Sequence, residues 1–142
     1  MFETTILYLL TQFATQLKVK IEKELAEFHL HSGQIFILFE LWKSDGMSQI
    51  DLSRKILVSP PTTNKMVKSL EKNQFVFTKT CKLDKRSVRV YLTPKGLGIR
   101  PEIEEKWKNI ENSVTNTLSL TEQIVLKDLF IKINRDNFNA ES

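Results

Sequence analysis

The sequence predicts a mainly α-helical protein that carries one small β-hairpin. Apolar residues recur at steps of three and four along most of the 142 residues, which is the period of amphipathic helices. Between residues 75 and 92 this period gives way to two short runs rich in β-branched and aromatic residues, which favours paired strands. The chain holds only four glycines and four prolines, so a collagen-like or loop-rich scaffold is excluded.

Residues 1–30 are predicted to form one long amphipathic helix, with nothing to break it before His29. A helix of about 25 residues is long for a small domain. Its apolar stripe exceeds what one compact domain needs to bury, so we expect part of it to contact a second copy of the chain. The residues expected at that contact are Phe2, Ile6, Leu9 and Phe13.

Three shorter helices are predicted between residues 31 and 73. The first follows Ser32, a suitable N-cap, and stops where residues 44–46 read Ser-Asp-Gly. Ser48 is the expected N-cap of a short helix, and after a turn at 57–58 Ser59 caps the next, with Pro60 at its first position. That helix should end near Asn73, which tolerates the left-handed conformation. The inward-facing residues are expected to be Ile50, Leu52 and Ile56, and then Thr63, Val67 and Leu70.

The second half of the chain is predicted to be a β-hairpin followed by helices. The strands are expected at 76–81 and 88–92, around a charged turn at 82–87. Thr93 and Pro94 restart a helix that Pro101 should kink or interrupt, and Ser119 with Glu122 has the spacing of a capping box for the last helix. That helix should bury Ile124, Val125, Leu129 and Ile133, of which Ile124, Leu129 and Ile133 are also assigned to the contact between copies.

Positive charge is concentrated in one short segment. The net charge is +4, but residues 59–89 hold eight lysines and arginines against two acidic residues, while the rest of the chain is slightly acidic. Such a segment is typical of a surface that binds a polyanion. A short capped helix, a tight turn and a second helix with small polar and cationic side chains form a helix-turn-helix, and the hairpin that follows makes it a winged one.

The second helix of this motif carries the side chains that reading a major groove requires. Asn64 can pair with adenine, Lys65 with guanine, and Thr62 with a base or a phosphate. Arg86 at the wing tip can enter a minor groove or meet a phosphate. The residues expected to contact DNA are Ser48, Gln49, Ser59, Pro61, Thr62, Asn64, Lys65, Lys68, Asp84, Lys85, Arg86 and Arg89.

At these positions the sequence resembles the MarR family of transcription regulators. Residues 84–96 read Asp-Lys-Arg-Ser-Val-Arg-Val-Tyr-Leu-Thr-Pro-Lys-Gly, which is similar to the family's wing signature. Residues 58–71 are similar to its recognition helix, 30–34 to the start of its second helix, and 118–129 to its final helix. The sequence departs from the pattern at Gln74, where the family usually has glycine, and at His31. Pro60 and Pro61 remove two N–H groups, so a phosphate there must be bound by the side chains of Ser59 and Thr62 and by the remaining N–H groups.

The resemblance implies a winged helix-turn-helix flanked by N- and C-terminal dimerisation helices. Residues 1–30 and 94–142 would form the dimerisation region of a homodimer, and residues 31–93 the DNA-binding domain. It also implies a roughly palindromic site in double-stranded DNA and a small, often aromatic effector that releases the DNA. Asp84 is expected to orient a neighbouring arginine.

The single cysteine and the two histidines each allow a second interpretation. Cys81, the single cysteine, lies between Lys79 and Lys82 and would make a thiol-based regulator, but we interpret it as a passive strand residue, because thiol-sensing members of the family typically carry their cysteine near the N-terminus. His29 and His31, with Glu24 or Glu27 nearby, are interpreted as structural rather than metal-binding.

The remaining residues do not indicate a ligand site or an enzyme. The aromatic residues Phe36, Phe39, Trp42 and Trp107 are interpreted as core. We expect no catalytic site, metal or cofactor, no membrane segment, and a cytoplasmic protein. A winged-helix module that binds proteins instead of DNA remains the alternative from another class.

Overall fold

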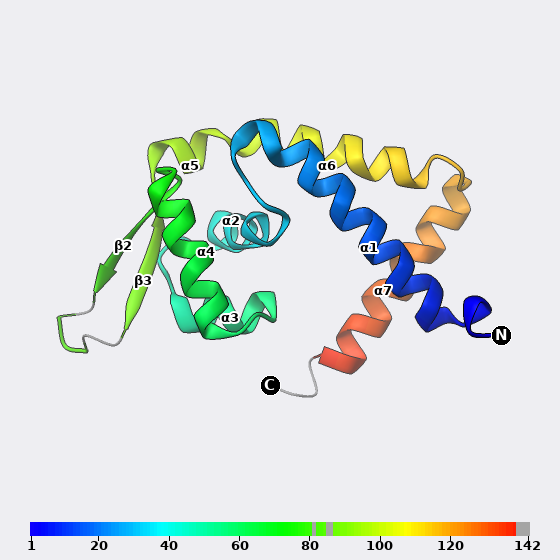
Figure 1. The fold of residues 1–142 in the computed structure, drawn as a ribbon, viewed down its shortest axis with the longest axis horizontal. Coiled ribbons are helices and arrows are strands. Elements are labelled where there is room, and N and C mark those ends of the chain that lie inside the picture. The colour runs from blue at the N-terminus through cyan, green and yellow to red at the C-terminus, as the bar shows by residue number, and fades with distance from the viewer. Residues whose placement is uncertain (81, 85–86, 139–142) are drawn as a thin grey trace. The chain divides into compact units, whose positions relative to one another are not determined.

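The computed structural model describes residues 1–80, 82–84 and 87–138, and these form a mainly helical fold with a small antiparallel sheet, which confirms the predicted fold class (Figure 1). Contacts divide the chain into two units, residues 1–105 and a second unit that begins at Lys106. The first unit contains the helix-turn-helix and the sheet. No helix in the described part of the chain is long and apolar enough to cross a membrane.

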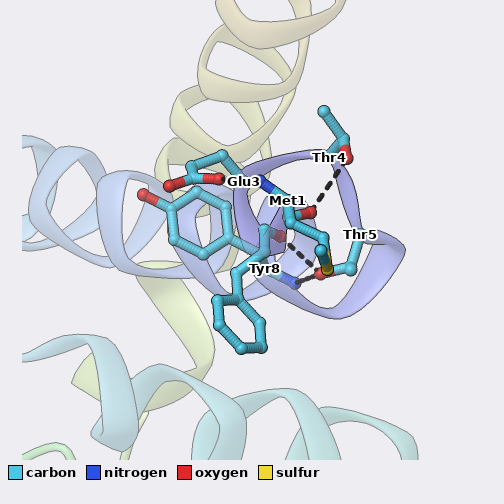
Figure 2. Close-up of polar contacts among 6 residues, drawn as sticks. Met1, Glu3, Thr4, Thr5 and Tyr8 are labelled. Carbon is cyan, nitrogen blue, oxygen red and sulfur yellow. Dashed lines mark hydrogen bonds and ion pairs between the residues drawn. The ribbon is translucent and has the colours of Figure 1, made fainter.

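The N-terminal helix is shorter than predicted. A 3-10 turn, η1 (Phe2–Thr4), precedes α1 (Ile6–Leu25), and Thr5 caps α1 by accepting the N–H of Tyr8 at 3.2 Å (Figure 2). Phe2 therefore lies outside α1, a correction that follows from the competition of the Thr5 hydroxyl with continued helix. After Leu25 the chain forms a 3-10 turn, η2 (Ala26–Phe28). This turn is capped by His29, whose φ of 57° is left-handed.

Helices α2 (Ser32–Lys43), α3 (Gln49–Ile56) and α4 (Pro60–Lys72) form the core of the first unit. The N-cap of α2 is His31 rather than Ser32, because the N–H and the hydroxyl of Ser32 both donate to the Glu22 carboxylate. Ile50 was expected to face inward but is exposed. It stands about 200° around the helix from buried Leu52, so the two side chains cannot share a face. The buried residues of these three helices include Ile35, Ile37, Leu38, Leu41, Leu52, Val67 and Leu70.

The predicted hairpin exists and is part of a three-stranded sheet. Strands β2 (Val76–Thr80) and β3 (Val88–Leu92) pair in antiparallel fashion, and β1 (Met47–Ser48) pairs with the other side of β3. The sequence did not predict β1. The left-handed residue after α4 is Gln74, with φ of 65°, and not Asn73, whose φ is −86°. Gln74 therefore takes the conformation that glycine adopts most easily.

The C-terminal helices begin at the predicted caps. Thr93 accepts the N–H of Gly96 and caps α5 (Pro94–Gly98). Ile99 is the C-cap of α5, and α6 (Arg100–Thr115) follows it. Pro101 lies in the first turn of α6, where proline is tolerated. In the second unit, Ser119 and Glu122 form the predicted capping box of α7 (Leu120–Phe138), with hydrogen bonds of 2.9 and 3.1 Å. The expectation that α7 buries its apolar residues within the chain is wrong, because Ile124, Val125, Leu129 and Ile133 are exposed.

Candidate nucleic-acid interface

Helix α4 has one buried face and one face with polar and cationic side chains. Thr63, Val67 and Leu70 are buried, as the spacing predicted. The other face carries residues that were expected to contact DNA: Pro61, Thr62, Lys65 and Lys68 are exposed, and Asn64 is half-buried. Because α4 follows α3 after a left-handed turn at Leu57, with φ of 57°, the pair forms the predicted helix-turn-helix.

The start of α4 offers hydroxyl groups rather than backbone N–H groups. The Thr62 N–H donates to the Ser59 hydroxyl at 3.4 Å, and the Thr63 N–H donates to the Ser59 carbonyl at 2.9 Å. Pro60 and Pro61 have no N–H, and the N–H groups of Thr62 and Thr63 already have partners within the chain. The Ser59 hydroxyl donates to the Thr62 hydroxyl at 3.0 Å, so these two oxygens lie together at the helix start.

A groove of about 470 Å³ runs between α3 and the loop end of the wing, where β3 begins. Ser48 caps α3 by accepting the Asp51 N–H at 3.1 Å, as predicted, and Ser48, Gln49 and Asp84 all belong to the set expected to contact DNA. The structure thus brings one end of the helix-turn-helix beside the wing. The residues that line this groove are Ser48, Gln49, Ile50, Asp51, Ser53, Pro60, Asp84, Ser87 and Val88.

One face of the wing is aromatic and cationic. The register places Phe77 opposite Tyr91 and Lys79 opposite Arg89, so these four side chains share the face opposite buried Val90. The rings of Phe77 and Tyr91 stack with centroids 5.4 Å apart and planes at 17°. The Lys79 ammonium lies 5.3 Å from the Tyr91 centroid and 5.7 Å from that of Phe77. A cation over two stacked rings stabilises this face of the hairpin.

Arg89 was expected to meet a DNA phosphate, and its guanidinium already has a partner in the protein. Its Nη1 donates to the Gly46 carbonyl at 2.8 Å, and Asp45 accepts the N–H of Leu92 at 2.9 Å. The sequence indicated Asp45 and Gly46 only as the end of a helix. Their contacts with β3 cross more than forty residues of chain, so no local pattern pointed to them. Three further predicted residues, Cys81, Lys85 and Arg86, lie outside the described residues, and Asp84 is exposed.

At the junction of α1 and α2, hydrogen bonds from Ser32 and a contact with His31 converge on Glu22. Glu22 accepts the Ser32 N–H at 2.8 Å, the Ser32 hydroxyl at 2.7 Å and a contact from His31 Nδ1 at 3.1 Å. Burial alone would raise the pKa of Glu22, but these hydrogen bonds together hold that pKa below its ordinary value. In the described residues no three His, Cys, Asp or Glu side chains are grouped as metal ligands.

Aromatic residues of α2 lie only partly in the core. Phe36 and Phe39 make an edge-to-face contact at 5.7 Å, and Phe39 and Trp42 follow at 5.8 Å. The Trp42 indole donates to the Gly96 carbonyl at 2.9 Å, which joins α2 to α5. Phe36 is 44% exposed, so the interpretation of this residue as core is wrong.

The residues assigned to dimerisation are exposed in the single chain. Phe2 and Ile6 are 78% and 82% exposed, and Leu9 and Phe13 are also uncovered. Ile124, Leu129 and Ile133 of α7 are likewise exposed. Large exposed apolar side chains gathered on a helix are characteristic of interaction sites.

Comparison with known proteins gives matches to a family model and to curated transcriptional regulators. The model of the MarR family matches residues 30–88. YwaE of Bacillus subtilis (strain 168), named as an uncharacterized HTH-type transcriptional regulator, is 27% identical over 128 residues, which cover 89% of this chain and 74% of YwaE. TtmR of Methylorubrum extorquens (strain PA1), named as an HTH-type transcriptional regulator, is 28% identical over 80 residues, which cover 56% of this chain and only 41% of TtmR.

Solved structures confirm the fold. The S. aureus MepR–DNA complex superimposes with a TM-score of 0.81 at 22% identity, covering 94% of this chain and 98% of that chain. A structure of Bordetella bronchiseptica BpsR, whose DNA binding is regulated by 6-hydroxynicotinic acid, gives a TM-score of 0.82 at 20% identity, covering 89% and 96% of the two chains.

Proposed function

We propose that the chain is a transcription regulator of the MarR family, whose model matches residues 30–88, and that it binds a pseudo-palindromic operator in duplex DNA as a homodimer. The observation that carries this proposal is the exposed face of α4, where Thr62, Lys65 and Lys68 stand opposite the buried stripe. A helix whose apolar face is already covered and whose other face holds short donors and cations fits a major groove.

The proposed roles divide between reading bases and holding phosphates. Asn64 and Lys65 lie one turn inside α4 and read base edges. Lys68 holds a phosphate, and Lys85 is assigned the same role. Arg86 is assigned to the minor groove, where a narrow A·T-rich tract attracts a guanidinium. Ser59 and Thr62 meet the DNA backbone through their hydroxyls, since the N–H groups of Thr62 and Thr63 already have partners within the chain.

The exposed apolar residues of α1 and α7 support the homodimer. Ile6 is 82% exposed, and covering such an apolar side chain with a second copy lowers the free energy of the assembly. Two symmetric lobes would then read two half-sites about one helical turn of DNA apart. The dimerisation region is assigned to residues 1–30 and 94–142, and the DNA-binding domain to residues 31–93.

A small aromatic effector and a cytoplasmic location complete the proposal. BpsR, which has the same fold, is regulated by 6-hydroxynicotinic acid, and on this basis we assign a ligand of similar aromatic character as the signal that releases DNA. Chromosomal DNA is the partner, and this places the protein in the cytoplasm of a prokaryote.

The test is footprinting of the purified protein on genomic DNA, followed by titration of the recovered duplex and a shuffled one at two salt concentrations. We expect the recovered duplex to bind roughly 10³-fold or more tightly than the shuffled one. Higher salt should lower the affinity for both duplexes, and it should change the ratio of the two affinities less than it changes either affinity. Equal binding of both duplexes would contradict the proposal and favour a winged-helix module that binds proteins.

A further inference from the structure

The segment from Asp45 to Ser48 is hydrogen-bonded along strand β3 of the wing. The Asp45 carboxylate accepts the Leu92 N–H at 2.9 Å. The Gly46 carbonyl accepts from the Arg89 guanidinium at 2.8 Å, and Met47 and Ser48 pair with Val90 and Arg89 as strand β1. The hydrogen bond that Asp45 accepts and the one that Arg89 donates are both part-buried, and each involves a charged group, which makes them stronger than neutral surface hydrogen bonds.

Gly46 fits this place because a larger residue would collide with the wing. It is buried and has φ of 73°, a conformation that favours glycine. A Cβ at this position would lie 2.7 Å from Cε1 of Tyr91. The Tyr91 ring is in turn stacked on Phe77 beneath the Lys79 ammonium. The segment and the exposed face of the wing are therefore packed as one body.

The same segment leads directly into the helix-turn-helix. Ser48, the last residue of β1, accepts the Asp51 N–H and caps α3, and α3 leads through the turn to α4. The contacts of Asp45 and Arg89 therefore join the wing to the start of the motif that carries the recognition helix. A change in these contacts alters the position of the wing relative to α3 without touching a residue of α4.

We propose that Asp45 and Arg89 are positioning residues that fix the wing against the helix-turn-helix, so that wing and recognition helix reach the DNA together. The inference rests on the proposed DNA binding. Arg89 then acts chiefly through its hydrogen bond to Gly46 and not as a counter-charge for a phosphate, and Asp45 strengthens DNA binding although it is negatively charged.

Asp45 gives a test in which positioning and charge predict opposite signs. Removal of a carboxylate from a DNA-binding lobe reduces its repulsion of phosphates and should strengthen binding. Loss of the hydrogen bond to Leu92 frees the wing and should weaken binding wherever the wing contributes. Asp45→Ala removes both charge and acceptor, whereas Asp45→Asn removes the charge and keeps an oxygen that accepts the Leu92 N–H.

The experiment titrates the full-length dimer with the footprinted duplex in two versions, one with A·T-rich and one with G·C-rich flanks. The wild type should prefer the A·T-rich version because of the wing. Asp45→Ala should lower affinity for the A·T-rich version by roughly three- to tenfold and reduce the flank preference toward one, while Asp45→Asn keeps it. Lys68→Ala, the charge control, should weaken both versions equally.

Gly46→Ala provides a second variant that changes no charge. It should reproduce the loss of flank preference by pressing on Tyr91, and its thermal unfolding is measured beside it to identify a variant that fails to fold. Tighter binding of Asp45→Ala to both duplexes, or an unchanged flank preference in it, would overturn the inference while leaving DNA binding intact. A wild type without flank preference would also overturn it. A wild type that binds the footprinted and shuffled duplexes equally would instead refute the proposed function itself.

Discussion

In α4 the apolar side chains face the core and the polar face is uncovered, whereas in the first half of α1 the apolar side chains are themselves uncovered. Val67 and Leu70 are buried, but Ile6 and Leu9 are more than half exposed. Only near its C-terminal end does α1 bury residues, at Ile21 and Leu25. Both helices are amphipathic, so periodicity alone does not say which face of each is available.

The difference identifies what each helix still requires. Exposed apolar area is removed from water at a gain of about 25 cal/mol per Å², so the uncovered half of α1 favours another protein surface. An exposed row of hydroxyl, amide and ammonium groups gains little from burial against protein but fits phosphates and base edges. α1 and α4 therefore point to different partners, and variants in each should fail in different assays.

The largest expected effect lies on α1. Leu9→Glu should place an unpaired carboxylate in the proposed contact between copies and cost about 3 kcal/mol or more of dimer stability, which is on the order of a hundredfold in the dimer dissociation constant. Light scattering across a concentration series measures that constant. Gln12→Glu, an exposed polar position on the same helix, is the control that adds the charge alone. A wild type that is monomeric at micromolar concentration would refute the dimer.

The next effect lies on the uncovered face of α4. Asn64→Ala should cost roughly 1–3 kcal/mol on the specific duplex and little on a shuffled one, because a lost base contact affects only the correct sequence. Lys68→Ala should weaken both duplexes nearly equally and reduce the salt slope by about one. Anisotropy titrations across salt measure both variants. The same loss for both variants on every duplex would show that α4 does not lie in the groove as proposed.

A smaller effect concerns the end of α4. Gln74→Gly should stabilise the protein by about 0.5–1 kcal/mol, because glycine adopts the φ of 65° without the clash that a Cβ meets. Asn73→Gly is the matched control, since its φ of −86° gives glycine no advantage and the variant should lose stability. Urea unfolding at fixed protein concentration compares the two. A loss of stability in Gln74→Gly would mean that the glutamine side chain makes a contact worth more than the strain.

The sequence was sufficient where structure depends on near neighbours. The caps at Ser48, Ser59, Thr93 and Ser119 were all predicted, because a hydroxyl and an N–H two or three residues later are enough to form one. The exposed face of α4 followed from the same local period. His31 replaced Ser32 as a cap because Glu22, ten residues away, takes both donors of Ser32.

The sequence was not sufficient where a contact crosses the chain. Strand β1 has two residues, too few for an alternating pattern, and it exists because β3 pairs with it. The partner of Arg89 is a backbone carbonyl 43 positions away, and any residue type has such a carbonyl. From the sequence, Arg89 therefore could not be distinguished from the other basic residues of the wing. Long-range backbone contacts leave no trace in local composition, and the proposed positioning role of Arg89 depends on one of them.

The smallest expected effect lies where the C-terminal end of α1, which buries Ile21 and Leu25, meets α2. Three contacts from Ser32 and His31 hold the pKa of Glu22 below its ordinary value of 4.5. A carboxyl whose pKa is lower in the folded than in the unfolded chain stabilises the fold at pH values above the unfolded pKa, and this contribution is lost as pH falls through the folded pKa.

Glu22→Gln should therefore cost about 1 kcal/mol or less at pH 7, since glutamine still accepts from Ser32 and Glu22 is partly solvated. The difference from wild type should shrink below about pH 4.5, as thermal unfolding between pH 7 and pH 3.5 at fixed concentration will measure. Ser32→Ala, which removes one of the donors, should shift that loss toward higher pH. A wild-type advantage that stays constant down to pH 3.5 would mean that Glu22 stabilises this junction by packing alone and not by its charge.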